Sequence, residues 1–379
     1  MRITGNVPGS GLTEVELAGK QIGSIRAVDA EDHEAPFISP GFIDIQMNGL
    51  RGLNFSGPDM EPEEIVEILP SVWKTGVTTF CPTLITGSHE SLVRSLRALE
   101  KARQIDPRFA RSAPCYHLEG PYLSPGPARG AHDITFMRPP SWDELLVLQE
   151  AAGNRIGMIT VAPELPGAFD FIRKATESGI TIALGHTDAT HEEIHRAAEC
   201  GAKLSTHLGN GSPQQMDRHQ SPFWAQMADD RLCASLICDT FHLPRELVQI
   251  IGRVKGTERC ILVTDASFVA GLSPGVYRSP NAEVELLSSG QVVSIDRRCM
   301  AGSSIGLNRA MHVFMEFGAG SMADAVAAAT KNPARLLPSN GITGHLREGE
   351  LANLVVFRRG ARELDVERVF LGGEEIYRK

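Results

Sequence analysis

The chain has 379 residues, of which 42% are hydrophobic and 22% are charged, a composition typical of a globular protein with room for a large α/β domain and a smaller companion. Its net charge of −9 and isoelectric point near 5.8 exclude a general attraction to nucleic acid or to anionic membranes. No apolar run approaches the roughly 20 residues of a membrane helix and residues 1–19 lack a signal-peptide core, so we expect a cytoplasmic protein.

Both ends of the chain have the pattern of short strands separated by glycine turns. The first 36 residues contain RITGN, EVELAGKQI and SIRAV, and the stretch from about 350 contains NLVVFRRG, VERVFL and EEIYRK. Each piece is too small to bury a core alone. We therefore predict that residues 1–37 and 345–379 form one small antiparallel β domain.

Between these ends, eight apolar runs alternate with segments of helical periodicity such as 63–76, 90–103 and 191–201. The runs are 37–45, 77–85, 115–120, 158–163, 181–186, 203–208, 233–239 and 259–265. Near-continuous apolar runs indicate buried parallel strands, and no GxGxxG or GxxxxGK[ST] motif follows any of them. The pattern predicts a (β/α)₈ barrel of the TIM type over residues 38–344. We also expect a hairpin insertion over residues 270–291, after the eighth strand.

Polar side chains follow several of these runs. IALGH ends at His186 and KLSTH at His207, whereas HLE ends at Glu119 and ILVTD at Asp265. The carboxyl ends of barrel strands meet at one rim, and one carboxylate with two imidazoles suits zinc with a fourth position left for water. Asp265 beside such a metal would accept a proton from the water. The alternatives are hydrogen-bonded core histidines and an aspartate that caps a loop.

Two further histidine-containing segments need an interpretation. HEEIH, from His191 to His195, matches the HExxH signature of zinc proteases, but Thr190 and Glu193 form a capping box, so we favour the first turn of a helix. A zinc protease stays the alternative. His117 shares a strand face with Glu119, and we expect it to orient that carboxylate without binding metal.

Several segments together carry a family resemblance. PGFIDIQMNG, HLEGPYLSPGPARGAH, GHTDAT, THLGNG, CDTFHLP, VTDAS, AGSS and, near the C-terminus, PARLL and GHLREGELANLVVF resemble the N-acetylglucosamine-6-phosphate deacetylase family of the amidohydrolase superfamily. The resemblance runs from residue 38 to about 360. It implies a (β/α)₈ barrel with a small β domain from both termini, metal ligands at Glu119, His186 and His207, and a catalytic aspartate at Asp265. The implied reaction converts N-acetylglucosamine 6-phosphate and water into glucosamine 6-phosphate and acetate.

The resemblance also implies the number of metal ions. Many amidohydrolases begin strand one with HxH and bind a second metal there, whereas this chain has Gln46 and Asn48 at those two positions. Carboxamides are poor substitutes for imidazole on zinc. We therefore expect one divalent ion per subunit, zinc or ferrous iron.

The family's substrate contacts fall on nine positions of this chain, namely Ala131, His132, Asn210, Gly211, Arg218, His242, Met300, Ala301 and Gly302. A guanidinium suits a phosphoryl group, and in family dimers this arginine serves the neighbouring subunit, so the resemblance implies a homodimer. The family usually continues after the ligand histidine with Phe, Asn, Ala and Met, but here the run is Gly209 to Ser212. This departure leaves open an N-acetylgalactosamine phosphate, an N-acyl amino acid, or a non-catalytic barrel that binds a sugar phosphate.

Overall fold

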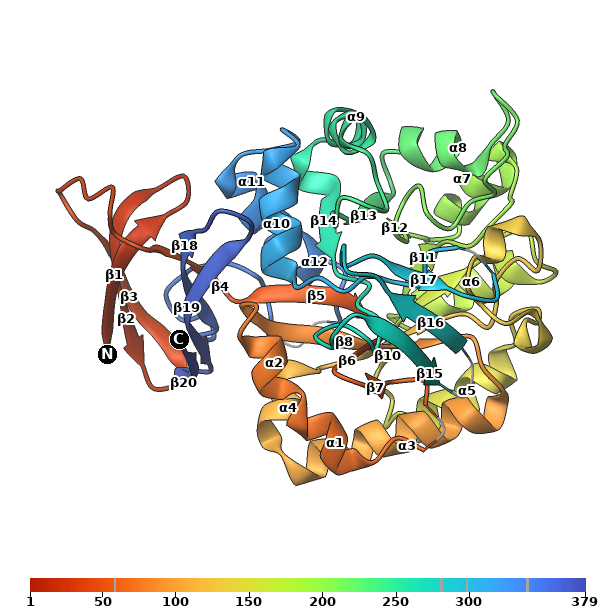
Figure 1. The fold of residues 1–379 in the computed structure, drawn as a ribbon, viewed down its shortest axis with the longest axis horizontal. Helices are drawn as coiled ribbons and strands as arrows, with labels where there is room; N and C mark the ends of the chain where they lie inside the picture. The colour runs from red at the N-terminus through yellow and green to blue at the C-terminus, as the bar shows by residue number, and fades with distance from the viewer. Residues whose placement is uncertain (58, 280–281, 298, 339–340) are drawn as a thin grey trace.

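The computed structural model describes residues 1–57, 59–279, 282–297, 299–338 and 341–379. It has two main parts, a barrel of eight strands and a seven-stranded sheet built from both ends of the chain (Figure 1). The smaller sheet lies beside the barrel at the left of the view, where both termini are also found. The predicted fold class, a (β/α)₈ barrel with a small β domain from both termini, is confirmed.

The barrel strands are all parallel and follow the order β14-β13-β12-β11-β10-β9-β8-β5. They are β5 (Phe42–Met47), β8 (Val77–Ile85), β9 (Tyr116–Glu119), β10 (Ile156–Val161), β11 (Thr181–Leu184), β12 (Leu204–Ser205), β13 (Cys233–Ile237) and β14 (Cys260–Val263). The Asp265 backbone N–H donates to the Gln46 carbonyl oxygen at 2.9 Å, just beyond β14. This bond and a bridge between Met47 and Ala266 join the two ends of the order and close the barrel.

Helices cover the outside of the barrel in the gaps that the sequence predicts. They are α1 (Pro62–Glu67), α2 (Leu69–Trp73), α3 (His89–Ile105), α4 (Pro107–Ser112), α5 (Trp142–Ala151), α6 (Ala168–Glu177), α7 (His191–Glu199), α8 (Pro222–Ala228), α9 (Arg245–Lys255), α10 (Leu307–Glu316), α11 (Met322–Ala328) and α12 (Lys331–Ala334), with short 3₁₀ turns at Pro127–Arg129, Ile134–Phe136 and Thr257–Arg259. No helix within the described residues is both long and apolar enough to cross a membrane.

Local sequence explains where these helices begin. The predicted capping box of Thr190 and Glu193 starts α7, and Ser88 accepts a hydrogen bond from the Ser91 N–H at the start of α3. The helical segment expected over 63–76 is present as two short helices, α1 and α2, which meet at Ile68. Pro70, in the first turn of α2, has no N–H to continue the hydrogen bonds of α1.

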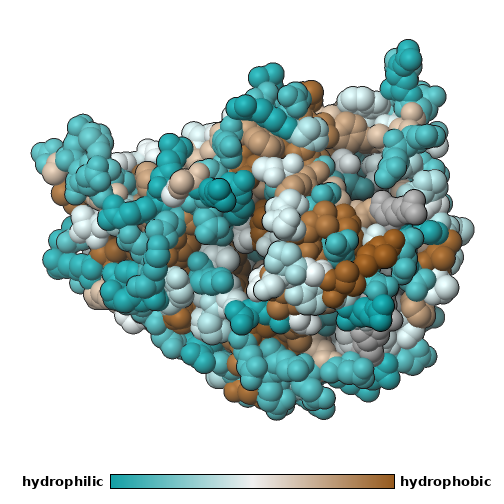
Figure 2. Space-filling model, viewed as in Figure 1, coloured by the Kyte–Doolittle hydropathy of each residue, from teal (hydrophilic) through white to brown (hydrophobic). Residues whose placement is uncertain are grey.

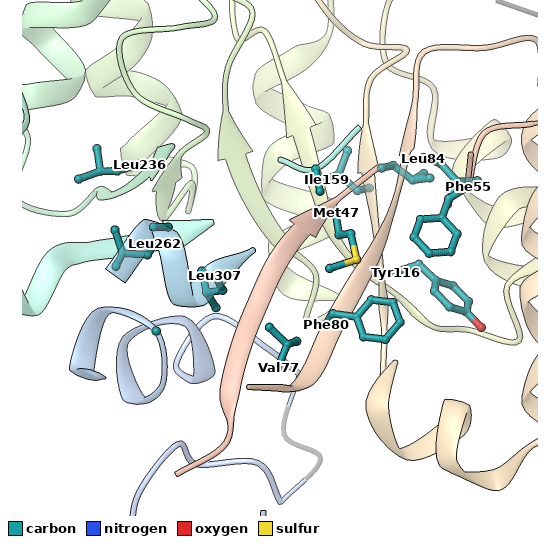
Figure 3. Packing of buried hydrophobic residues seen from close by; sticks show 14 of the residues in the cluster. Met47, Phe55, Val77, Phe80, Leu84, Tyr116, Ile159, Leu236, Leu262 and Leu307 are labelled. Carbon is teal, nitrogen blue, oxygen red and sulfur yellow. The ribbon is translucent and has the colours of Figure 1, made fainter. Parts of the chain in front are cut away.

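Side chains from the strands fill the barrel interior. Adjacent residues of a strand point to opposite faces, so Cys81 of β8 lies in the interior cluster whereas Phe80 packs outside, against the helices. In that outer cluster the rings of Phe55 and Phe80 have centroids 6.3 Å apart (Figure 3). The interior cluster includes Ile43, Met158, Ala183, Leu204, Ile237 and Ile261. Because the interior is packed, a ligand site is expected at an end of the barrel.

The terminal sheet has the order β20-β19-β18-β4-β1-β2-β3. Its strands are β1 (Arg2–Val7), β2 (Gly11–Ala18), β3 (Gln21–Ala27), β4 (Phe37–Pro40), β18 (Leu354–Arg359), β19 (Leu364–Leu371) and β20 (Glu374–Arg378). Its pairs are antiparallel except β1 with β4, where Asn6 lies opposite Phe37 in parallel. β4 thus joins the two ends of the chain into one sheet.

The single strand expected over 37–45 is wrong, because β4 belongs to the terminal sheet and β5 to the barrel. The two strands separate at Gly41, where a Cβ atom would lie 2.0 Å from Thr78 Oγ1. Only a residue without a side chain allows this close approach. The division of the chain into 1–37 with 345–379 and 38–344 stays a prediction.

The insertion after β14 is a three-stranded antiparallel sheet, β15 (Gly275–Ser279), β16 (Ala282–Leu286) and β17 (Val292–Ser294). The predicted hairpin is therefore present with one more strand, and its residues 280–281 lie outside the described residues. Val276 and Ile295 of this region are 55% and 39% exposed. Hydrophobic side chains gather in the middle of the face in view, whereas the surface of the terminal sheet is mainly hydrophilic (Figure 2). A short hairpin of β6 (Gly49–Leu50) and β7 (Leu53–Asn54) follows β5.

Candidate metal and active site

Four polar side chains from different strands converge at the carboxyl ends of the barrel. Glu119 is the last residue of β9, and His186, His207 and Asp265 each lie two residues beyond the end of β11, β12 and β14. All four are at most 7% exposed. The backbone φ angles of His186, His207 and Asp265 are 48°, 29° and 48°. Left-handed backbone at a residue other than glycine is uncommon and clusters at functional sites. The left-handed backbone at His207 ends the extended conformation, so β12 is shorter than the predicted run 203–208.

Three of these side chains form a possible metal site. One ligand atom from each of Glu119, His186 and His207 lies within 4.8 Å of the other two. Glu119 Oε1 is 2.8 Å from His207 Nε2 and 3.4 Å from His186 Nε2, and the two Nε2 atoms are 3.2 Å apart. One carboxylate and two imidazoles are a donor set that suits a divalent transition metal.

The hydrogen bonds of the histidine rings fit this assignment. His186 Nδ1 is 2.9 Å from the Ala128 carbonyl oxygen, which only accepts, so Nδ1 carries the proton and the neutral ring presents a lone pair at Nε2. This arrangement is typical of a metal-binding histidine. His207 lacks it, because its Nδ1 is buried without a hydrogen-bond partner in the described part of the chain. The donor set and the orientation of the His186 ring are the observations that fit a metal ion.

His132 extends this chain of hydrogen bonds. Its Nε2 lies 3.2 Å from His186 Nε2 and its Nδ1 lies 3.0 Å from Thr86 Oγ1. Since His186 Nε2 holds a lone pair, the proton of His132 must be on Nε2, and Thr86 donates to Nδ1. Burial lowers the pKa of His132 to about 3. His132 thus presents a neutral N–H donor to the site.

Burial and neighbouring charges separate the two carboxyl groups of the site. Burial raises the pKa of Asp265 to about 6, and the charge of Glu119 acts in the same direction. Burial also opposes ionisation of Glu119, but the neighbouring imidazoles of His186 and His207 hold the pKa of Glu119 well below its usual range. A carboxylate that stays ionised suits a metal ligand, and one that titrates near neutral pH suits proton transfer.

Two carboxamides link these carboxyl groups to the first barrel strand. Gln46 Nε2 donates to Glu119 Oε1 at 2.8 Å and to Asp265 Oδ1 at 3.1 Å, and Asn48 Nδ2 donates to Asp265 Oδ1 at 2.6 Å. From the sequence, Gln46 and Asn48 were interpreted only as replacements for metal-binding histidines. Their position at the carboxyl end of strand one was a signal that they lie at this rim, but it did not specify which carboxylates they contact.

Most of the predicted substrate-binding residues surround this site. Asn210 Nδ2 donates to the His207 carbonyl oxygen at 3.1 Å. A Cβ atom on Gly211 would lie 2.6 Å from the His186 nitrogen, and one on Gly302 would lie 2.6 Å from the Asp265 carbonyl oxygen. Met300 pairs with Val293 in an isolated bridge, so the insertion holds the segment Met300, Ala301 and Gly302 beside Asp265.

Ala131 and His242 lie at the same rim. The Ala131 carbonyl oxygen accepts a hydrogen bond from Arg297 of the insertion. His242 Nδ1 is 2.6 Å from Asp239 Oδ2, and the charge of His242 affects the pKa of Asp265. Asp239, which had no predicted role, fixes the His242 ring, and among the described residues no hydrogen bond of His242 Nε2 is found.

Within the described part of the chain, no contact of Arg218 with the other predicted site residues is found. It lies in an exposed loop, and its one described hydrogen bond is from Trp224 Nε1 to its backbone carbonyl oxygen at 3.1 Å. The guanidinium of Arg218 is thus exposed to solvent in the single chain.

Two of the sequence interpretations can be compared with contacts. His117 does not hold Glu119, because its ring nitrogens are 3.1 Å from the Ile45 carbonyl oxygen and 2.8 Å from Thr160 Oγ1; that expectation is wrong. In the HExxH segment, His191 bonds to the Ser221 carbonyl oxygen and His195 to Asp229. The two rings have separate partners, and the capping box is the better account of the segment.

Comparison with known proteins gives consistent similarities. Residues 37–376 match the model of the Amidohydrolase family. The chain is 27% identical over 347 residues to an N-acetylgalactosamine-6-phosphate deacetylase of Escherichia coli O157:H7, covering 92% of this chain and 89% of the relative. A crystal structure of N-acetyl-D-glucosamine-6-phosphate deacetylase from Mycobacterium smegmatis is 30% identical with a TM-score of 0.88, and each chain is covered completely.

A mutant of the mycobacterial deacetylase, solved in complex with N-acetyl-D-glucosamine-6-phosphate, is also similar to this chain. It has 28% identity and a TM-score of 0.87, with 99% of this chain and 98% of that chain covered.

Proposed function

Because the chain belongs to the amidohydrolase family and, within it, to the N-acetylglucosamine-6-phosphate deacetylases, we propose that it removes the acetyl group from an N-acetylated amino-sugar phosphate. N-acetylglucosamine 6-phosphate is the proposed substrate, and glucosamine 6-phosphate and acetate are the products. The observation that carries the proposal is the convergence of Glu119, His186 and His207 at one rim, with Asp265 joined to Glu119 through Gln46.

Glu119, His186 and His207 would hold one divalent ion per subunit, zinc or ferrous iron, which supplies Lewis-acid polarisation of the amide carbonyl and lowers the pKa of a water molecule to about 7. A ligand set of two imidazoles and one carboxylate is compatible with either metal. One ion is proposed because Gln46 and Asn48 stand at the two positions where a second metal would need imidazoles, and both amides already donate to carboxylates.

Asp265 is proposed as the group that moves the proton. It accepts a proton from the attacking water as the water oxygen bonds to the carbonyl carbon of the acetamido group. The carbon–nitrogen bond then breaks, and Asp265 returns the proton to the departing amine. A pKa of about 6 leaves Asp265 mostly ionised at neutral pH and still basic enough for this exchange.

The remaining side chains bind and orient the substrate. Once the His186 Nε2 lone pair is bound to a metal, the Nε2–H of His132 would be released to donate to the oxyanion of the tetrahedral intermediate. Ala131, Asn210, Gly211, His242, Met300, Ala301 and Gly302 would contact the sugar. Arg218 would bind the phosphate of a substrate in the neighbouring subunit of a homodimer, an arrangement supported by its exposed position in the single chain. We propose a cytoplasmic location, which suits seven free cysteines.

A panel assay of acetate release tests this function. N-acetylated glucosamine, galactosamine and mannosamine would each be offered with and without the 6-phosphate. We expect the highest kcat/KM for N-acetylglucosamine 6-phosphate. Preference for the galactosamine phosphate would favour the activity named for the Escherichia coli relative. A panel without acetate release would contradict the proposal and favour an N-acyl amino acid.

A non-catalytic barrel that binds a sugar phosphate is the second candidate. Metal analysis after dialysis separates it from the enzyme, since an enzyme of the proposed kind retains close to one zinc or iron per chain. A protein without metal and without activity after zinc is added back would support the non-catalytic barrel.

A further inference from the structure

A cavity lies at the opposite end of the barrel from Glu119. It has a volume of about 470 Å³, and its walls come from both parts of the protein. Cys115 directly precedes β9 and Ile156 begins β10, whereas Leu371 ends β19 of the terminal sheet. The cavity therefore lies between the amino ends of the barrel strands and the terminal sheet, a position typical of ligand sites between structural units.

The walls of this cavity are cationic. Lys20, Arg103, Arg111 and Arg155 line it, and none of the described residues that line it is Asp or Glu. The chain as a whole has a net charge of −9. The described lining residues, with four cations and no acid, therefore have the opposite charge to the protein as a whole. Such a concentration of one charge in a cavity creates a positive potential and attracts anions.

Each arginine is held in place by part of its guanidinium. Arg103 Nη1 donates to the Ala110 and Ala113 carbonyl oxygens, Arg111 Nη1 donates to the Leu371 carbonyl oxygen at 3.2 Å, and Arg155 Nη1 donates to the Gly153 carbonyl oxygen at 2.9 Å. For Arg103 and Arg155, Nη2 has no described partner in the residues that the structure covers. The guanidinium groups are thus oriented, with donors left for a ligand.

Acidic neighbours offset only part of the charge. Arg155 Nη1 is 2.8 Å from Glu100 Oε2, and Arg111 Nη2 is 2.8 Å from Glu374 Oε2. Arg103 lies 3.9 Å from the same Glu100. Lys20 is exposed, and no hydrogen bond or ion pair is described for its ammonium group among residues 1–57, 59–279, 282–297, 299–338 and 341–379. Two carboxylates against four cations leave about two positive charges, which matches a dianion.

We propose that this cavity binds a small phosphorylated molecule through its phosphate dianion. Arginine groups held in a plane offer paired donors to phosphate oxygens, and the volume is within the range of small-molecule sites. Lys20 comes from the terminal sheet and Arg103 and Arg155 from the barrel, so the ligand connects the two parts of the protein. It is a binding site separate from the one that holds the substrate.

The test measures binding by calorimetry with glycerol 3-phosphate and, separately, inorganic phosphate as probes. Lys20→Glu is the main variant, because this side chain has no described partner and its replacement leaves the fold intact. We expect its Kd for glycerol 3-phosphate to rise at least about tenfold, the effect of losing one charge-assisted contact. Arg97→Glu is the matched control, since it changes the net charge by the same two units at an exposed residue of α3 that does not line the cavity, and its Kd should equal that of the wild type.

Hydrogen exchange locates the bound anion. Saturating glycerol 3-phosphate should slow exchange in residues 110–116 and 371–373 of the wild type and not of Lys20→Glu. Tighter binding of glycerol 3-phosphate than of inorganic phosphate supports a phosphorylated metabolite as the ligand. Equal Kd values for the two probes support free phosphate as the ligand of the same cavity. An unchanged Kd in Lys20→Glu, or protection confined to residues near Glu119, would overturn the proposal. No step depends on acetate release, so the proposed deacetylase activity can fail independently.

Discussion

Gln46 Nε2 lies 2.8 Å from Glu119 Oε1, so a neutral amide of the first barrel strand donates to a carboxylate at the end of the third. The same nitrogen lies 3.1 Å from Asp265 Oδ1. An amide group has two protons, so Gln46 can hold the proposed metal ligand and the proposed proton acceptor at the same time. It does so without adding a charge to a buried site.

Replacing this amide tests its role. In Gln46→Leu both hydrogen bonds are lost while the side chain keeps a similar volume, and we expect kcat/KM to fall about 10- to 100-fold, as for other groups that orient metal ligands. Acetate release and metal content check the result. Gln249→Leu is the control, because the Gln249 amide bonds to the Phe317 carbonyl oxygen, outside the described site. Full activity in Gln46→Leu would show that neither carboxylate needs the amide.

Replacing Asp265 should remove activity alone, whereas replacing His207 should remove both the metal and the activity. Asp265→Asn keeps the shape of the side chain but cannot accept a proton, so we expect kcat to fall about 10²- to 10⁴-fold with the metal retained. His207→Ala should lose metal as well as activity. Metal analysis of both proteins, with acetate release, separates the two roles. Loss of metal from Asp265→Asn would mean that Asp265 is a ligand and the assignment is incomplete.

Much of this site could be predicted because its residues end apolar runs. His186, His207 and Asp265 each terminate a run whose burial is evident from hydrophobicity, and the ends of parallel strands meet at one rim. The contacts of Gln46 could not be predicted in the same way. They depend on the relative heights of β5, β9 and β14 around the barrel, and no periodicity in the sequence encodes these heights.

The strand boundary within residues 37–45 has a different cause. Ser39, Pro40 and Gly41 interrupt the apolar run and are a local signal for a break between β4 and β5, which the prediction of one strand did not use. The contact of Gly41 with Thr78, 37 positions along the chain, determines the division. His117 was assigned to Glu119 because they share a strand face, but its ring reaches Ile45 of β5 and Thr160 of β10 instead.

Asp44 should make the stability of the protein depend on pH. Burial raises its pKa to about 7, although Thr264 and the Gln46 N–H donate to it. In the unfolded chain the pKa is about 3.9, so between these values the folded state holds a proton that the unfolded state has lost. The contribution of Asp44 to stability is therefore largest below about pH 4 and falls as the pH rises through 7.

Asp44→Asn measures this contribution, because asparagine cannot ionise. The free energy of unfolding of the variant minus that of the wild type should be about 2 to 3 kcal/mol larger at about pH 8 than at about pH 5. Chemical denaturation at both pH values gives the difference. The exposed Asp143, replaced by Asn, is the control and should show no such change. A pH-independent difference for Asp44→Asn would contradict a raised pKa.

Arg218 should affect substrates according to their phosphate. In Arg218→Ala we expect KM to rise about tenfold or more for N-acetylglucosamine 6-phosphate and to stay the same for N-acetylglucosamine, because only the first has the group that a guanidinium binds. Steady-state kinetics on both compounds checks this. Arg253→Ala, on the exposed side of α9, controls for net charge. An equal rise for both substrates would remove Arg218 from the phosphate site.

Gly211 tests whether the ligands are held by close backbone packing. A Cβ atom there would lie 2.6 Å from the His186 nitrogen and 3.1 Å from His207 Cε1, so Gly211→Ala must displace at least one of the two histidines although it removes no ligand. We expect weaker metal binding and a fall in kcat/KM of about 10- to 100-fold. Excess zinc should restore part of the activity, because the ligands are still present. Gly126→Ala is the matched control in a neighbouring loop, where the new atom would only approach Ser124 Oγ at 3.5 Å. If Gly211→Ala binds metal as the wild type does, then the histidines move freely enough to accommodate a methyl group, and the site is less rigid than its packing indicates.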